Sequence, residues 1–196
     1  MKQYFQENYD LPNDEVEIRK TLFGYNFLFL SKRGLFSYNE IDDNSLTLIE
    51  NIQKPKGSLL DLGCGFGAVG IILAKVYGIK LTGCDINRVA IEMAKKNASI
   101  NEVFGDFIHS DCFNGVTGCF DTIVLNPPIH AGKEVVYKMY TKAKEHLKIG
   151  GAFYIVINKK HGALTSLCKL AELYDECTTV YKKKGTYVIE CKTCGG

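Results

Sequence analysis

The sequence predicts an α/β fold in which helices cover both faces of a mostly parallel sheet. From residue 58 onward, short apolar runs typical of strands alternate with longer runs typical of helices. This alternation is the pattern of parallel strands joined by crossover helices. The last two strand-like runs follow each other closely, so they are expected to form an antiparallel pair at one edge.

Seven strand-like runs build the predicted sheet, and helices follow most of them. The strands are expected at residues 58–63, 80–85, 105–111, 120–126, 152–157, 177–183 and 186–192. The helices are expected at residues 67–77, 88–98, 133–148 and 163–174. Asn87 is expected to cap the second of these helices, and Gly150 and Gly151 are expected to stop the third.

An extension at residues 1–42 is predicted to precede a core at residues 43–196. Residues 16–30 carry β-branched and aromatic residues around a glycine, which is the pattern of a two-stranded hairpin. Residues 33–39 are expected to form a loop, and Asp42, Asp43 or Asn44 can cap a helix that follows it. No linker divides the sequence, so we expect a single domain.

The size and composition are ordinary for a globular protein. The chain has 196 residues, of which 46% are hydrophobic and 23% are charged, and its formal net charge is +2. So small a net charge argues neither for nor against a nucleic-acid partner, and any basic binding site must be local.

The N-terminal sequence predicts a cytoplasmic protein that does not enter a membrane. Residues 1–18 lack the apolar core of a signal peptide, and no apolar run approaches the length of a membrane span. The eight cysteines are therefore expected to be free thiols. Cys191 and Cys194 form a lone CxxC pair whose role stays open, and no metal site is predicted because structural zinc needs four ligands.

A glycine-rich turn follows the first strand of the core. It reads DLGCGFG, and Gly63, Gly65 and Gly67 let the backbone pass close to a ligand. A helix begins at once, so its free amide groups face the same space. The turn therefore predicts a ligand site at the start of this helix.

Polar residues end four of the predicted strands. They are Asp61, Asp85, Asp111 and Asn126. The carboxyl ends of parallel strands meet at one edge of the sheet, where open α/β folds bind their ligands. Four converging polar groups beside a glycine turn are the usual signature of a binding site.

Two ligand classes match this pattern. Residues 65–70 have the spacing GxGxxG, and Asp85 lies about where a dinucleotide site places its ribose-binding acid. A carboxylate at Asp61, however, would lie close to the phosphates of NAD. S-adenosylmethionine (AdoMet) has no phosphate; it offers a cationic amino group to Asp61, a ribose diol to Asp85 and an adenine amine to Asp111. The carboxylates therefore favour AdoMet.

These segments resemble the motifs of class I AdoMet-dependent methyltransferases. DLGCGFG resembles their first motif, GCDIN their ribose motif and HSDCF their adenine motif. LNPPIHAGK resembles the (D/N/S)-P-P-(Y/F/W) motif of enzymes that methylate planar amines. The segments GLFSYN, NPPIHAGK and INKKHGA are similar, more narrowly, to the 16S ribosomal RNA guanine-N2 methyltransferases and their short single-domain relatives.

The resemblance covers nearly the whole chain from about residue 16, and it has structural and functional implications. It implies a Rossmann-like class I methyltransferase fold with a seven-stranded, mostly parallel sheet, an antiparallel C-terminal edge pair and a small N-terminal hairpin. It implies AdoMet as cofactor and ribosomal RNA or an assembling small ribosomal subunit as partner. Larger family members carry an additional N-terminal half, and Ile129 stands where many amine methyltransferases have an aromatic residue.

The resemblance also implies three groups of site residues. The cofactor would contact Phe36, Asp61, Gly63, Gly65, Gly67, Asp85, Ile86, Asp111, Cys112 and Asn126. The catalytic corner would be Asn126, Pro127 and Pro128. The methyl acceptor would contact Ile129, His130, Lys133, Lys159 and Lys160.

The rigid corner at Asn126-Pro127-Pro128 suggests how a base amine could be methylated. Two prolines exclude both a continuing strand and an immediate helix. The Asn126 side-chain oxygen and the Pro127 carbonyl could accept the two N–H groups of the amine and turn its nitrogen toward the methyl group. A paired base cannot reach such a corner and must be single-stranded or flipped out, with Phe36 or Tyr38 available to cover it.

Other functions stay open from the sequence. Protein glutamine or DNA adenine methylation uses the same corner, although such enzymes favour an aromatic residue at position 129. An NAD-dependent oxidoreductase would use the glycines but leaves Asp61, Asp111 and Asn126 unexplained. A non-catalytic RNA-binding factor on the same fold is the fourth reading. The oligomeric state is open as well.

Overall fold

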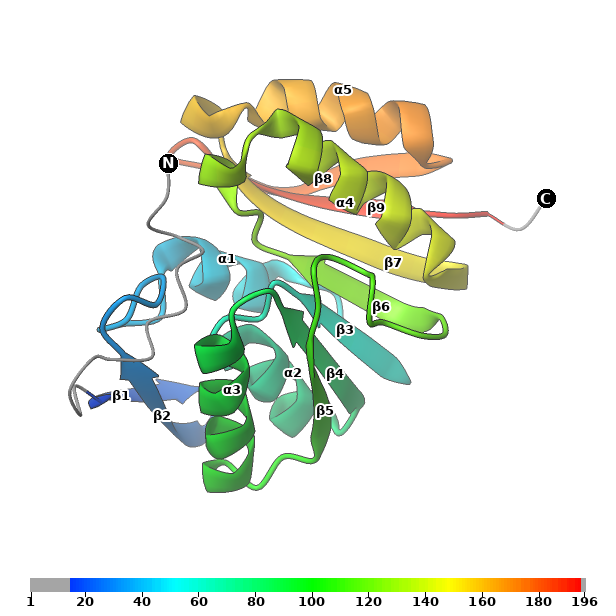
Figure 1. Cartoon of the computed structure of the whole chain (residues 1–196). Helices are drawn as coiled ribbons and strands as arrows, with labels where there is room; N and C mark the ends of the chain where they lie inside the picture. The colour runs from blue at the N-terminus through cyan, green and yellow to red at the C-terminus, as the bar shows by residue number, and fades with distance from the viewer. Residues whose placement is uncertain (1–14, 195–196) are drawn as a thin grey trace.

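The centre of the structure, a computed structural model that describes residues 15–194, is one seven-stranded sheet. The strands are β3 (Ser58–Leu62), β4 (Lys80–Asp85), β5 (Gly105–His109), β6 (Phe120–Leu125), β7 (Leu147–Asn158), β8 (Glu176–Lys183) and β9 (Thr186–Lys192). Their order in space is β5-β4-β3-β6-β7-β9-β8 (Figure 1). All neighbours from β5 to β7 are parallel, and β9 is antiparallel to β7 and β8. The predicted fold class is therefore confirmed.

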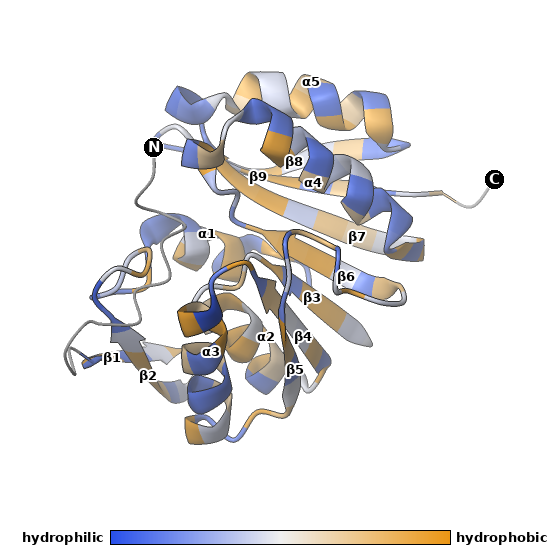
Figure 2. Cartoon of the chain, viewed as in Figure 1, coloured by the Kyte–Doolittle hydropathy of each residue, from blue (hydrophilic) through white to orange (hydrophobic). Residues whose placement is uncertain are grey.

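The helices form a layer on each face of this sheet. They are α1 (Asp43–Asn51), α2 (Ala68–Tyr77), α3 (Arg88–Ile100), α4 (Lys133–Glu145) and α5 (Ala163–Leu173). One buried apolar cluster joins α1, α2 and α3 to the sheet, and a second joins α4 and α5 to its other face. Figure 2 shows the consequence, with apolar residues along β6 and β7 and hydrophilic residues on the outer side of α3.

The sheet order places a ligand site next to β3. After β3 the chain builds β4 and β5 on one side, and then returns to place β6 on the other. This reversal is the topological switch point, where the loops at the carboxyl ends of the strands part and leave a crevice. The glycine turn follows β3 directly, so it lies at this point.

The predicted border between the third core helix and the strand after it is wrong, and the strand expected at residues 105–111 ends at His109. The helix expected over residues 133–148 ends at Glu145, and β7 starts at Leu147 instead of at residue 152. Leu147 pairs with Phe120 of β6 through a β-bulge, and its side chain is buried. Gly150 and Gly151 therefore lie inside the strand and do not stop the helix, as was expected of them; a Cβ added at Gly151 would come within 2.9 Å of the Lys148 carbonyl. Two single 3-10 turns, Ile129–Ala131 and Lys159–His161, also went unpredicted.

The predicted hairpin is present as β1 (Glu15–Leu22) and β2 (Tyr25–Lys32), and it is held by Asn97 of α3 and by Asn101, the C-cap of that helix. Asn97 accepts from the Leu30 N–H at 2.7 Å and donates to the Leu30 carbonyl at 2.8 Å. Asn101, one helical turn further on, bonds both backbone groups of Leu28 in the same way, at 3.1 and 2.8 Å. The two side-chain amides thus give the backbone of β2 the hydrogen bonds that a neighbouring strand would otherwise give it.

Asn97 also connects the hairpin to the glycine turn. Its side-chain nitrogen donates to the Phe66 carbonyl at 2.8 Å, and its side chain is fully buried. The rings of Phe29 and Phe66 meet edge to face, with their centroids 6.0 Å apart. The hairpin therefore supports the segment on which the ligand site depends.

Several expectations about the ends and borders of the chain stay predictions. The division into an extension and a core at residue 43 is one of them. Residues 1–14, on which the signal-peptide expectation mainly depends, lie outside the described range. Between residues 15 and 194, no helix has the length and the apolar character that crossing a bilayer requires.

Candidate active site

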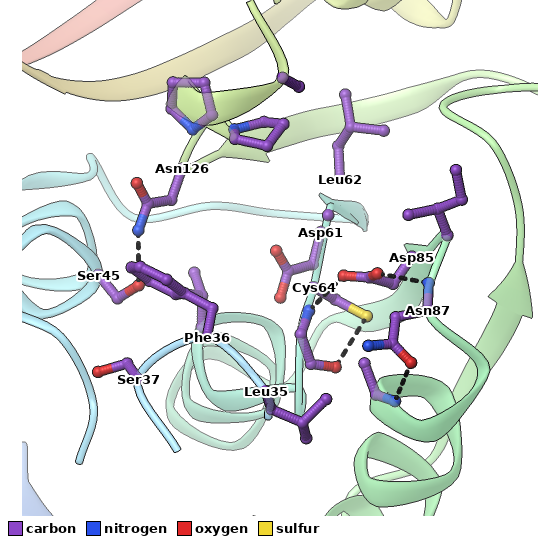
Figure 3. Close-up of a pocket in the computed structure, with 18 of the residues that line it drawn as sticks. Leu35, Phe36, Ser37, Ser45, Asp61, Leu62, Cys64, Asp85, Asn87 and Asn126 are labelled. Atoms are coloured by element: carbon purple, nitrogen blue, oxygen red, sulfur yellow. Dashed lines mark hydrogen bonds between the residues drawn. The ribbon is translucent and has the colours of Figure 1, made fainter. Parts of the chain in front are cut away.

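A cavity of about 500 Å³ lies at the carboxyl ends of β3, β4, β5 and β6 (Figure 3). Its wall is completed by residues 34–37 and by the first turn of α1. The predicted site residues that line it are Phe36, Asp61, Gly63, Gly65, Asp85, Ile86, Asp111, Cys112, Asn126, Pro127, Pro128, Ile129 and His130. The volume suits a ligand of cofactor size.

Asp85 is held by backbone groups of both neighbouring loops. One carboxylate oxygen accepts from the Gly65 N–H at 2.9 Å, and the other accepts from the Asn87 N–H at 2.8 Å. Burial raises the pKa of Asp85, and these N–H groups lower it in part. Each oxygen keeps a lone pair, so the fixed carboxylate can accept hydrogen bonds from both hydroxyls of a ribose.

Asp61 lies deeper in the same half of the cavity and is only 4% exposed. One of its oxygens accepts from the Gly70 N–H of α2 at 2.8 Å, an amide that lies in the first turn of the helix. Burial raises the pKa of Asp61 to about 7, and the nearby Asp85 charge adds to the shift. A cationic ligand group would restore the ionised form, so Asp61 fits the amino group of AdoMet.

The glycines of the turn have different tasks. Gly63 and Gly65 have φ values of 72° and 55°, and a Cβ on either would meet no protein atom within 4 Å. Their open sides line the cavity, which leaves room for a ligand against the backbone. Gly67 does not line the cavity; a Cβ there would come within 2.8 Å of Ile71 and 3.1 Å of Ala94. It is a packing glycine between α2 and α3.

The loop after β5 is fixed internally and presents Asp111 at the rim. Ser110 donates to the Cys112 carbonyl at 2.9 Å and accepts from the Gly115 N–H at 2.9 Å. Cys112 has a positive φ of 52°. Asp111 itself is exposed and lines the cavity.

The corner after β6 is built as expected, and its peptide bonds are trans. Pro127 is buried, and Pro128 precedes the 3-10 turn Ile129–Ala131. The Asn126 side-chain nitrogen donates to the Ser45 hydroxyl at 3.2 Å, which Figure 3 shows. It also donates to Asp42 at 3.2 Å. The structure records no bond to its side-chain oxygen within the described residues, so this oxygen can accept from a ligand.

An exposed aromatic residue lies at the mouth of the cavity. Phe36, from the loop before α1, is 54% exposed and lines the cavity together with Asn126 (Figure 3). Ile129, half-buried, occupies the position after the corner. A planar base can therefore stack on the Phe36 ring rather than on residue 129.

Some predicted acceptor residues lie outside the cavity wall, and some wall residues were not predicted. Lys133, Lys159 and Lys160 do not line it, whereas His161, next to the two lysines, does. Asp42 and Ser45 of the α1 segment line it as well. Only the cap role of Asp42 could be inferred from sequence. Its contact with Asn126 joins residues 84 positions apart, which no local pattern encodes.

The cysteines do not assemble into a metal site in the part of the chain that the structure describes. No group of three or more His, Cys, Asp or Glu side chains there could hold an ion. Cys191 is buried and faces Cys177 on β8, with the two sulfurs 2.8 Å apart, while Cys194 is exposed. The two cysteines of the CxxC therefore lie in different surroundings.

The switch-point cavity, its buried Asp61 and half-buried Asp85, and the Asn-Pro-Pro corner together define the class, which is that of AdoMet-dependent methyltransferases. A family comparison agrees with this class. The chain belongs to the methyltransferase small domain family, whose model matches residues 26–190.

Individual relatives agree with this family. The chain is 38% identical over 195 residues to the uncharacterized protein YbxB of Bacillus subtilis, covering 96% of this chain and 97% of YbxB. It is 40% identical over 134 residues to ribosomal RNA small subunit methyltransferase C of Aeromonas hydrophila, covering 66% of this chain. That match covers only 39% of the Aeromonas protein, so the chain spans well under half of its length.

A solved structure shares the fold over nearly the full chain. It is a T. thermophilus 16S rRNA N2 methyltransferase in complex with AdoMet and guanosine, with a TM-score of 0.85 and 27% identity. The similarity covers 96% of this chain and 53% of that one. AdoMet is thus the cofactor that both the fold and the donor set of the cavity indicate.

Proposed function

We propose that the protein transfers the methyl group of AdoMet to the exocyclic N2 amine of a guanine in small-subunit ribosomal RNA. The observation that carries this proposal is Asn126, an amide held at a rigid corner in the cavity with its oxygen free to accept a hydrogen bond. The relative solved with AdoMet and guanosine, and the ribosomal RNA methyltransferases of similar sequence, support the choice of acceptor.

The cofactor half of the cavity would bind AdoMet through its carboxylates. Asp61 would pair with the amino group, Asp85 would accept from the ribose hydroxyls, and Asp111 would meet the adenine amine at the rim. When bound, AdoMet supplies an electrophilic methyl group on a sulfonium. The open backbone at Gly63 and Gly65 lets the ligand lie against the turn.

The acceptor half would orient a weak nucleophile. The lone pair of a guanine amine is delocalised into the ring, so the site must hold the nitrogen in a reactive geometry. The Asn126 side-chain oxygen and the Pro127 carbonyl would accept its two N–H groups. These contacts also stabilise the positive charge that develops on the amine during transfer. Phe36 would stack on the base.

A basic rim gives the cavity a surface that suits RNA. We define the basic rim as Lys159, Lys160, His161, Lys182, Lys183 and Lys184, all of which are exposed. The Lys159 N–H donates to the Gly185 carbonyl at 2.6 Å, which brings its two segments together at the end of β7. His161 lines the cavity, so the lysines beside it would contact phosphates that flank a bound base.

The proposal is tested by offering labelled AdoMet to unmodified small-subunit RNA, to small ribosomal subunits and to total protein. Label recovered as N2-methylguanine with wild-type protein, and lost with Asn126→Ala, supports the proposal. Asn114→Ala, outside the cavity, is the matched control and should retain activity. Label found only in protein would contradict the RNA assignment, and label in RNA as another nucleotide would contradict the guanine assignment. A cytoplasmic location, where assembling subunits occur, belongs to the same proposal.

A further inference from the structure

We propose that Asp42 is a positioning residue that sets which end of the Asn126 amide is offered to the methyl acceptor. This inference rests on the proposed function, because it concerns how the same corner receives an amine. It adds to the corner a carboxylate that lies 84 positions earlier in the chain.

The contact joins the start of α1 to the end of β6. The Asn126 side-chain nitrogen donates to the two Asp42 oxygens at 3.2 and 3.4 Å. It also donates to the Ser45 hydroxyl at 3.2 Å. All three residues line the cavity, so the contact lies within the site itself.

The chemistry of an amide explains why this contact matters. A half-turn of the Asn126 amide exchanges its oxygen and its nitrogen without changing its shape. The oxygen can accept from an exocyclic amine, whereas the nitrogen would place donor against donor. A carboxylate only accepts, so Asp42 bonds the nitrogen and repels the oxygen. The Asp42 carboxylate therefore favours the orientation that leaves the oxygen for the acceptor.

Ser45 cannot make the same distinction. A hydroxyl both donates and accepts, so it could bond either end of the Asn126 amide. Ser45 is thus a contact of similar length, 3.2 Å from the same nitrogen, that does not select between the two ends of the amide. It serves as an internal control for the loss of one hydrogen bond without loss of orientation.

Asp42 is itself held in place by the helix that it caps. Its Oδ1 accepts from the Asn44 N–H at 3.1 Å and from the Ser45 N–H at 3.2 Å. As the N-cap of α1 it has extended backbone angles, with φ −64° and ψ 153°. The start of α1 therefore fixes the carboxylate, and the carboxylate fixes the amide. The capping role must be separated from the positioning role by any test.

Asp42→Asn separates them. Asparagine caps a helix about as well as aspartate, so α1 keeps its cap. Because Oδ1 makes the cap bonds, the asparagine oxygen keeps that place and the NH2 group replaces Oδ2, 3.4 Å from the Asn126 nitrogen. The variant therefore loses one of the two acceptors that orient the Asn126 amide and gains a donor that opposes its NH2 group. The double variant Asp42→Asn/Asn126→Asp reverses the pair: the new carboxylate accepts from the new amide and keeps a second oxygen as acceptor.

We expect Asp42→Asn to lower kcat for methyl transfer to small-subunit RNA by about 30-fold, with an unchanged Tm and cofactor Kd. Ser45→Ala removes a hydrogen bond to Asn126 without removing the orienting charge, so its loss should be severalfold smaller than that of Asp42→Asn. The double variant should recover about tenfold over Asp42→Asn. Equal losses in Asp42→Asn and Ser45→Ala, or no recovery in the double variant, would overturn the positioning role.

An NMR measurement makes the inference independent of the substrate. The side-chain NH2 signal of Asn126, assigned by its loss in Asn126→Asp, should be shifted downfield and protected from solvent exchange in wild type. Asp42→Asn should remove the shift, and Ser45→Ala should retain it. If wild type shows this signal but methylates no RNA, the proposed function fails and the orientation by Asp42 stands. If the Asn126 signal has the chemical shift and the solvent exchange of a free amide, the inference fails, whatever the methyl-transfer activity.

Discussion

The two halves of the cavity are held together in different ways. In the cofactor half, Asp61 and Asp85 are fixed by backbone N–H groups of the glycine turn, of the adjoining helix or of the loop after β4. In the acceptor half, the functional side chain is fixed by other side chains. Asn126 depends on Asp42 and Ser45, 84 and 81 positions earlier in the chain.

This difference indicates what each half requires from the rest of the protein. The cofactor half depends on short segments that follow β3 and β4, two adjacent parallel strands. The acceptor half exists only once the start of α1 has packed against the end of β6. Substitutions in the two halves should therefore have separable effects on cofactor binding and on the acceptor step.

The largest effect is expected from a substitution in the cofactor half, and it should appear as a loss of cofactor affinity. Asp85→Asn retains the size of the side chain but places an NH2 group against a backbone N–H and removes the charge. We expect the affinity for S-adenosylhomocysteine to fall about 100-fold, or about 3 kcal/mol, measured by calorimetry. Asp111→Asn at the exposed rim should cost less than about tenfold. Equal losses at the two positions would contradict the difference in burial on which this prediction rests.

The next effect concerns the support beneath the cofactor half. Asn97→Ala would remove hydrogen bonds to Leu30 and Phe66 and leave buried backbone groups without partners. The free energy of unfolding should fall by about 2–3 kcal/mol, which lowers Tm by about 5–10 °C.

A matched control on α1 tests this reading of Asn97. The half-buried Asn51 donates one side-chain hydrogen bond to a carbonyl of its own helix, at 2.8 Å. Asn51→Ala should cost less than about 1 kcal/mol in the same thermal denaturation. A Tm shift as large as that of Asn97→Ala would show that the hairpin contacts add nothing.

The pH dependence of cofactor binding sharpens the comparison further. Burial raises the pKa of Asp61 to about 7, so below that pH the free protein holds a proton that a cationic amino group must expel. Affinity for S-adenosylhomocysteine should therefore rise about tenfold from pH 6 to pH 7.5 and then level off. Asp61→Asn should bind weakly with a flat profile over this range. A wild-type profile that is flat as well would exclude Asp61 as the partner of the amino group.

The same shift has a consequence for the stability of the free protein. The folded-state pKa of Asp61 lies above its ordinary value of 3.8. Its contribution to stability is therefore complete below pH 4 and is lost as the pH rises to about 7. Bound cofactor should reverse this loss, because the ionised carboxylate then has a cationic partner.

The smallest effect is expected at the basic rim, beside the acceptor half. Lys159→Ala/Lys160→Ala should weaken RNA binding about five- to tenfold at 0.1 M salt and reduce the salt slope by about 1.4–1.8. Cofactor affinity should not change. The control pair Lys95→Ala/Lys96→Ala, on α3 and outside the cavity wall, should leave the slope near wild type. An equal reduction there would mean that RNA contacts are spread over the surface rather than placed at the site.

Much of the fold was predictable because its patterns are local. The alternation of strand and helix runs, the glycine turn and the four polar strand ends could all be recognised from neighbouring residues. The cavity brings Asp61, Asp85, Asp111 and Asn126 together as the parallel order of the strands requires. Local patterns predicted the ends of helices and strands less well. The helix expected to reach residue 148 ends early because Leu147 pairs with Phe120.

Contacts between distant side chains were not predictable. Asn97 appears in the sequence as an ordinary polar position of a helix, and Asn101 lies just beyond the predicted helix, yet both bond the backbone of β2. Asp42 has the local signature of a helix cap, and it performs that task. Its second task, toward Asn126, has no signal in either segment.

The sequence by itself determined the fold class, the position of the cofactor half and the presence of an amide at a proline corner, since each depends on the order of residues within one short segment. Only the tertiary structure decided how that amide is held and which of its atoms is free. These contacts form between groups that come together only after the strands and helices have packed. The spacing of such groups along the chain does not predict the contact.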